Sequence, residues 1–123
     1  MPAIPIQVTF KGIAHSYALE LQIRESVEWL RQYEPDITGC RVVIEVPHRH
    51  HQDVRLFRVR LSVSVPDGAP MMVDREQTAR ETAKAEDQYQ DAYVLVREAF
   101  DIARRRLQDF VREQRGFVKA HSR

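Results

Sequence analysis

The stretch Leu56–Val65, LFRVRLSVSV, alternates apolar and polar side chains along its whole length. Successive side chains of a β-strand point to opposite faces of a sheet, so this pattern predicts a strand with one buried face. The apolar set is Phe57, Val59, Leu61, Val63 and Val65. Arg58 and Arg60 then fall on the other, open face. A sheet with one covered and one open face is typical of antiparallel pairing.

The segments around this strand complete a small sheet. Pro66-Asp67-Gly68 is a turn signal, and we expect Ala69–Val73 to pair back as a hairpin. Upstream, Arg41–Val46 is rich in β-branched residues, which favours a strand. Ile6–Phe10 alternates and is expected to form an edge strand. Residues 75–90 are polar and acidic, and we expect an acidic loop there, with a partly helical segment as the alternative.

Two helices are predicted from apolar residues spaced three and four apart. Ser16 is a plausible N-cap for the first, which should run to about Glu34. Its apolar stripe is Leu19, Ile23, Val27 and Leu30. The last helix should include Tyr93–Phe110 and end at Gly116. Its stripe is Tyr93, Val96, Phe100, Ala103, Leu107 and Phe110.

The element order is therefore β-α-β-β-β-α, which predicts an α+β fold of two layers. A four-stranded sheet should carry both helices on one face, and the α-β-β-β-α portion resembles a double-stranded RNA-binding domain. The first two strands should be parallel, because a helix crosses between them. At 123 residues the chain is expected to form a single domain, 1–123.

Composition narrows the function. The chain is 43% apolar and has no apolar run long enough for a membrane span, and its start, MPAIPIQVTF, lacks the features of a signal peptide. A single cysteine, Cys40, rules out an internal disulfide and favours a cytoplasmic protein. Residues 1–73 are neutral, residues 74–91 carry −3 and residues 92–123 carry +4. Positive charge is therefore concentrated in the last helix.

Arginines gather on one flank of that helix. Arg97, Arg104 and Arg115 should lie along one edge of its stripe, with Arg105 and Arg112 just beyond. The opposite flank carries Glu98, Asp109 and Glu113, with Arg106 as its one base. Such a strip suits a polyanion, because the guanidinium group is well shaped for phosphate. The alternative is a solvated helix face, in which Asp101 pairs with Arg97, Arg104 or Arg105.

The first helix carries Arg24 and Arg31, seven residues apart on one flank. If both helices pack on one face of the sheet, these arginines should lie beside Arg97 and Arg104 and form one continuous basic ridge. Trp29 lies off the main stripe of its helix. We expect it to pack against the sheet edge, and stacking on a nucleic-acid base is the alternative.

No catalytic residue, metal ligand or cofactor is predicted. His48, His50 and His51 form a polar loop, but His50 and His51 are adjacent, which makes shared coordination of a zinc ion awkward. Cys40 stands among β-branched residues and is expected to be a small core residue. A metal-dependent enzyme that uses the histidine loop remains an alternative, and metal analysis would distinguish it.

Several stretches, in this order, resemble the ribosome hibernation-promoting factors, also called ribosome-associated translation inhibitors, in their short form. They are Val27-Glu28-Trp29-Leu30, Thr38-Gly39-Cys40-Arg41-Val42, Pro47-His48-Arg49-His50-His51, Val65-Pro66-Asp67-Gly68, Glu86-Asp87, Asp91-Ala92-Tyr93 and Ala99-Phe100-Asp101-Ile102-Ala103-Arg104-Arg105-Arg106-Leu107. The resemblance extends from Ile6 to about Lys119. The resemblance implies a short form, without the additional C-terminal domain by which long forms pair two ribosomes.

The resemblance implies a cytoplasmic, non-catalytic protein that binds the small ribosomal subunit near the decoding centre and silences idle ribosomes under stress. It implies ribosomal RNA contacts at Arg24 and Arg31 on the first helix and at Arg97, Arg104, Arg105 and Arg112 on the last. Arg115 joins this set through its place on the arginine flank. The partners are then the small subunit and its RNA, with no membrane and no DNA expected. A generic double-stranded RNA-binding module and a protein–protein adaptor are the alternatives.

Overall fold

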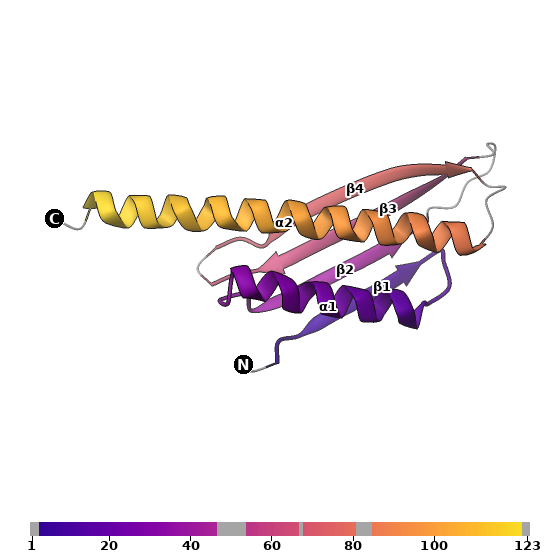
Figure 1. The fold of residues 1–123 in the computed structure, drawn as a ribbon, viewed down its shortest axis with the longest axis horizontal. Helices are drawn as coiled ribbons and strands as arrows, with labels where there is room; N and C mark the ends of the chain where they lie inside the picture. The colour runs from indigo at the N-terminus through magenta and orange to yellow at the C-terminus, as the bar shows by residue number, and fades with distance from the viewer. Residues whose placement is uncertain (1–2, 47–53, 67, 81–84, 122–123) are drawn as a thin grey trace.

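The computed structural model describes residues 3–46, 54–66, 68–80 and 85–121. They form a four-stranded sheet with two helices, in the predicted order β-α-β-β-β-α. The elements are β1 (Ile6–Lys11), α1 (Tyr17–Tyr33), β2 (Gly39–Glu45), β3 (Val54–Ser64), β4 (Met71–Arg80) and α2 (Ala85–His121). Both helices lie on one face of the sheet (Figure 1). The α+β fold predicted from the sequence is thus confirmed.

The strands stand in the order β1-β2-β3-β4. β1 pairs with β2 in parallel, and the two following pairs are antiparallel. The parallel pair follows from the α1 crossover, and β1 is an edge strand as expected. Ser16 caps α1, because its hydroxyl oxygen accepts a hydrogen bond from the Leu19 backbone N–H at 3.2 Å.

The core lies between the sheet and the helices. Alternate residues of each strand point into it, and the register aligns them across the sheet. Val8 pairs with Val42, Val42 pairs with Leu61, and Leu61 pairs with Val73. From the helices, the buried apolar residues are Leu19, Ile23, Val27, Leu30, Ala92, Leu95, Val96, Ala99, Phe100, Ala103 and Leu107. The buried face predicted for β3 is confirmed at Phe57, Val59, Leu61 and Val63.

The expectation of an acidic loop over residues 75–90 is wrong at 75–80, which belong to a strand, whereas the helical alternative is confirmed at 85–90; residues 81–84 lie outside the described part. β4 continues to Arg80 and α2 already begins at Ala85. The strand needs no apolar alternation here, because charged residues pair across it: Arg58 on β3 contacts both Asp74 and Glu76 on β4.

The last helix also extends further than expected at its other end. It passes through Gly116 and continues to His121. A glycine inside a helix costs only about 1 kcal/mol relative to alanine, which does not stop a helix whose neighbours favour it. In Figure 1 the C-terminal part of α2 projects past the sheet and past α1.

Candidate nucleic-acid interface

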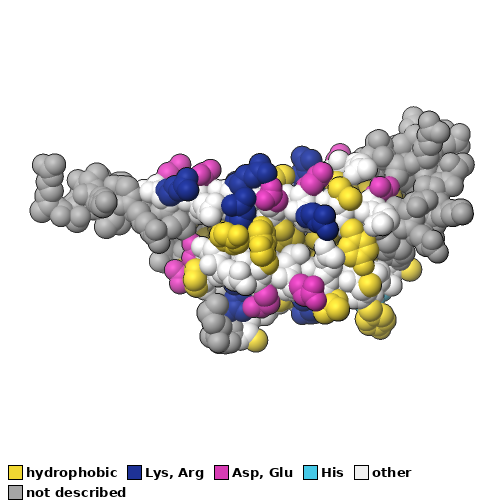
Figure 2. All heavy atoms as spheres, viewed as in Figure 1, with side chains coloured by type: hydrophobic (Ala, Val, Ile, Leu, Met, Phe, Trp, Pro, Cys, Tyr) yellow, Lys and Arg dark blue, Asp and Glu magenta, His cyan; other side chains and the backbone are white. Residues whose placement is uncertain are grey.

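The arginine flank of α2 faces outward from the helical layer. Figure 2 shows dark-blue basic side chains along α2, with acidic ones between them. α2 packs on β3 and β4 and lies beside α1. The predicted sorting of charge around α2 is therefore presented at the surface, on the side away from the sheet.

Arg97 and Arg112 are the available cations of this flank. Both side chains are exposed. In the part of the chain that the structure describes, neither forms an ion pair or a hydrogen bond with a carboxylate. Arg115 belongs to the same helix, but its side chain lies outside the described residues. Arg97 and Arg112 can accept an external anion without giving up an internal partner.

Arg104 and Arg105 are held by the same carboxylate. Arg104 Nη2 lies 3.3 Å from Asp101 Oδ1, and Arg105 Nη2 donates to Asp101 Oδ2. Arg104 Nη1 also donates to Gln108 Oε1 at 3.0 Å. The Arg104 guanidinium carbon is 5.4 Å from the centre of the Tyr33 ring on α1, a cation–π contact. The predicted local pairing of Asp101 is confirmed for these two arginines, and Arg97 takes no part in it.

The acidic flank of α2 is turned toward β4. Glu98 accepts a hydrogen bond from Arg75 Nη2 at 2.9 Å. Arg106, the one base of this flank, donates to the backbone oxygen of Met72 at 2.8 Å. These contacts fix the rotation of α2 and leave its arginine flank on the other side.

The basic residues of α1 do not join those of α2. The Arg31 side chain is only 4% exposed and donates to both carboxylate oxygens of Glu28, at 3.0 and 3.3 Å. Arg24 is exposed, but its Nε lies 3.7 Å from Glu20 Oε2, so the two side chains form an ion pair. Trp29 faces α2, and Arg31 is two residues further on, so Arg31 projects about 200° away from it. The expectation of one continuous basic ridge across both helices is wrong.

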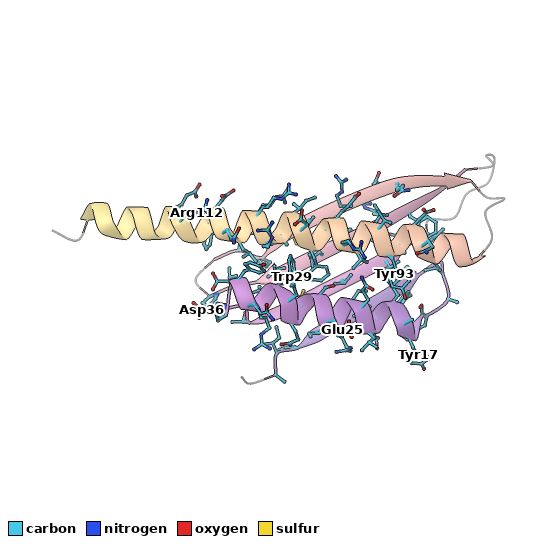
Figure 3. All side chains as sticks on the ribbon, viewed as in Figure 1. Tyr17, Glu25, Trp29, Asp36, Tyr93 and Arg112 are labelled. Carbon is cyan, nitrogen blue, oxygen red and sulfur yellow. The ribbon has the colours of Figure 1, made fainter. Side chains whose placement is uncertain are left out.

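Aromatic and acidic side chains occupy the space where that ridge was expected. A groove of about 590 Å³ runs between the helices. It is lined by Glu25, Ser26 and Trp29 of α1 and by Arg97, Phe100 and Asp101 of α2. Trp29 packs against Tyr33, with ring centres 5.2 Å apart, and Figure 3 shows it between the helices. It therefore packs against α2 rather than at the sheet edge; the spacing of Ser26, Trp29 and Tyr33 was the available sequence signal for this second helix face.

The open face of the sheet has basic residues, but its charges compensate each other. Arg58 Nε is 3.0 Å from Asp74 Oδ1, and Arg60 Nη2 is 3.0 Å from Glu45 Oε2. The hydrogen bond from Arg58 lowers the pKa of Asp74, and that carboxylate raises the pKa of Arg58 in turn. The prediction that Arg58 and Arg60 lie on the open face is confirmed, and their internal partners make this face a weaker anion-binding surface than α2.

No feature of the described residues indicates catalysis. Cys40 is buried, and burial raises the pKa of its thiol to about 12, so it is a poor nucleophile. Among the described residues, no three His, Cys, Asp or Glu side chains gather as a metal site would require. His48, His50 and His51 lie outside the described residues. None of the described helices has the length and apolar character of a membrane span.

Comparison with known proteins gives one family and a shared fold. The model of the family described as Sigma 54 modulation protein / S30EA ribosomal protein matches residues 6–115. A ribosomal subunit interface protein from Coxiella burnetii has the same fold, with 14% identity and a TM-score of 0.58 over 87% of this chain and 97% of that one. The N-terminal domain of Protein Y from Thermus thermophilus is 17% identical, with a TM-score of 0.57 over 87% and 99%. Among curated proteins, no sequence matches this chain.

Proposed function

The chain belongs to the Sigma 54 modulation protein / S30EA ribosomal protein family, and on this premise we propose that it binds the small ribosomal subunit and inhibits translation by occupying the decoding region. The membership confirms the resemblance predicted from the ordered sequence motifs. It makes the chain a ribosome-associated protein of a family that acts in translation regulation and is in general non-enzymatic. We propose in addition the binding site on the ribosome, the contacts to RNA and a cytoplasmic location.

The observation that carries the proposal is the arginine flank of α2. The guanidinium groups of Arg97 and Arg112 are exposed and have no carboxylate partner among the described residues, so they are suited to RNA phosphates, which they can bind through paired hydrogen bonds. Arg104 and Arg105 extend the same flank between them. Phosphate contacts of this kind release counterions, so the binding should weaken steeply as salt rises.

Inhibition would be steric. A rigid two-layer domain held by α2 against ribosomal RNA would fill the space that transfer RNA needs, with no chemical step. Helix α1 contributes little to the proposed interface, because Arg31 is buried and Arg24 is paired with Glu20. The proposal therefore places the RNA-facing side at α2, with Arg97, Arg104, Arg105, Arg112 and Arg115 as its contact residues.

Sedimentation with purified small subunits tests the proposal. We expect the protein to pellet with the subunits at low salt and to be released progressively as salt rises. Small subunits loaded beforehand with initiator transfer RNA and message should exclude it, and excess protein should depress translation in an extract. Undiminished binding to the loaded subunits would contradict the decoding-region site.

A free RNA duplex serves as the matched control. A generic double-stranded RNA-binding module would bind the duplex as tightly as it binds subunits, because such modules recognise the shape of the helix. We expect at least about tenfold weaker binding to the duplex at the same salt. Equal affinities would favour the generic module.

A further inference from the structure

Asp101 occupies the position between two arginines that an anion from outside would otherwise take. Its two oxygens are divided between them: Oδ1 is 3.3 Å from Arg104 Nη2, and Oδ2 accepts from Arg105 Nη2. A carboxylate and an RNA phosphate offer guanidinium groups the same interaction, a charge-assisted hydrogen bond to an anionic oxygen. The arrangement is a filled anion site.

We propose that Arg104 and Arg105 form a phosphate site on α2 and that the Asp101 carboxylate is its resident competitor, which an RNA phosphate must displace. This inference rests on the proposed function, since it identifies one of the contacts by which that function would be carried out. It assigns Asp101 the role of limiting affinity rather than of contacting RNA.

The exposure of the three side chains makes the exchange feasible. Arg105 is 66% exposed, Asp101 39% and Arg104 25%, so a phosphate can reach the pair from solvent. Ion pairs with this exposure are weak, because water and salt screen them. An RNA whose other phosphates contact Arg97 and Arg112 can therefore bring one phosphate to this pair and displace the carboxylate.

Arg104 would remain positioned after Asp101 is displaced. Gln108 Oε1 accepts from its Nη1 at 3.0 Å, and the Tyr33 ring lies 5.4 Å from its guanidinium carbon. Neither partner carries a charge that competes for phosphate. The site is thus organised by neutral contacts and blocked by a charged one, which is the arrangement expected if the carboxylate tunes binding rather than builds the site.

One functional consequence is discrimination between RNAs. Isolated phosphates must compete with Asp101, whereas a ribosomal surface that contacts several arginines at once gains enough from the others to displace it. Asp101 should therefore weaken binding to unstructured RNA more than binding to the subunit.

Asp101→Asn tests the inference, with Asp109→Asn as its matched control. Both variants remove one negative charge from α2, but Asp109 is exposed and makes no ion pair with the described residues. We expect Asp101→Asn to raise the affinity for small subunits about fivefold. The slope of log affinity against log salt should also become steeper, by an amount that corresponds to the release of roughly one more counterion. Asp109→Asn should change affinity by less than about twofold, because the charge is screened.

The double variant Arg104→Ala with Arg105→Ala provides the background for a double-mutant cycle. In that background Asp101→Asn should raise affinity no more than Asp109→Asn does, because the carboxylate then blocks nothing. Circular dichroism and melting temperature confirm that each variant is folded before it is compared.

The outcomes separate the two proposals. If neither the wild type nor any variant binds subunits, the proposed function fails. If the wild type binds but the two Asn variants are equal, only net charge matters and the inference is overturned. A loss of affinity in Asp101→Asn also overturns it, because Asp101 would then position the arginines for RNA.

Discussion

Arg31 shows that an arginine on a helix flank is not necessarily a surface charge. Its side chain is 4% exposed, whereas that of Arg105, on the other helix, is 66% exposed. Arg31 lies near the end of α1, where its aliphatic stem can pack against the core while the guanidinium reaches Glu28 one turn earlier. Sequence periodicity gives the direction in which a side chain leaves its helix, but not how closely neighbouring segments cover it.

The backbone geometry just after the end of β1 requires a glycine at position 12. Its φ is +70°, and a Cβ added there would lie 2.1 Å from the backbone oxygen of Val46. We predict that Gly12→Ala lowers the free energy of unfolding by about 2 kcal/mol or more, because it combines a strained conformation with a backbone clash. Urea denaturation measures the loss.

Gly39→Ala is the matched control for this prediction. A Cβ at Gly39 would lie 3.6 Å from the Pro5 backbone oxygen, which is ordinary contact, and its φ is not in the left-handed region. We expect a much smaller change, within about 1 kcal/mol. Equal losses in the two variants would contradict the special role of Gly12.

At the scale of elements, α1 and β3 were predictable because each carries an uninterrupted pattern. Ser16 capped the helix where expected, and β3 alternated along nearly its full length. β4 was only partly predictable, since its second half has no apolar alternation and is held by backbone pairing to β3. The start of α2 was missed for a related reason: its first residues are polar and acidic, so they show no buried stripe.

The cross-strand pair between β3 and β4 predicts a pH effect. Arg58 holds the pKa of Asp74 below its ordinary value of about 4, so the folded state binds the proton more weakly than the unfolded state. Its contribution to stability is present above that ordinary value and is lost as pH falls through the lowered pKa. In Asp74→Asn this contribution is absent throughout.

We therefore expect Asp74→Asn to lower the melting temperature at pH 7 by about 1–3 °C, a small change because both side chains are substantially exposed. The difference from the wild type should shrink as pH falls below about 4, where the wild type loses the ionised pair. Thermal melts from pH 7 to pH 2 measure it. A difference that stays constant across this range would contradict the assignment.

For the whole molecule, the two faces have different electrostatic characters. On the open face, Arg58 and Arg60 are matched by Asp74, Glu76 and Glu45. On the helical face, α2 presents Arg97 and Arg112 without such partners among the described residues. The sequence predicted where the arginines of α2 lie, because helical spacing fixes that. It could not predict which of them lack a carboxylate partner among the described residues, because that depends on side-chain contacts such as those of Asp101.

This difference selects the variants that best test the interface. We predict that reversing the charge at these two exposed positions, Arg97→Glu with Arg112→Glu, weakens binding to small subunits at least about tenfold and flattens its salt dependence, because two phosphate contacts become repulsions. The fold should be retained, since both side chains are exposed and break no described ion pair. Co-sedimentation across a salt series measures both quantities.

Lys11→Glu with Arg41→Glu is the matched control, because it makes the same change in net charge at two exposed residues of β1 and β2. If RNA meets the molecule through α2, the control should retain most of the affinity, since its charges lie on the open face of the sheet, opposite the helices, and are screened by solvent there. If both double variants lose affinity equally, binding responds to total charge and the α2 interface is wrong. If only the control loses it, the open face of the sheet is the side that meets the ribosome.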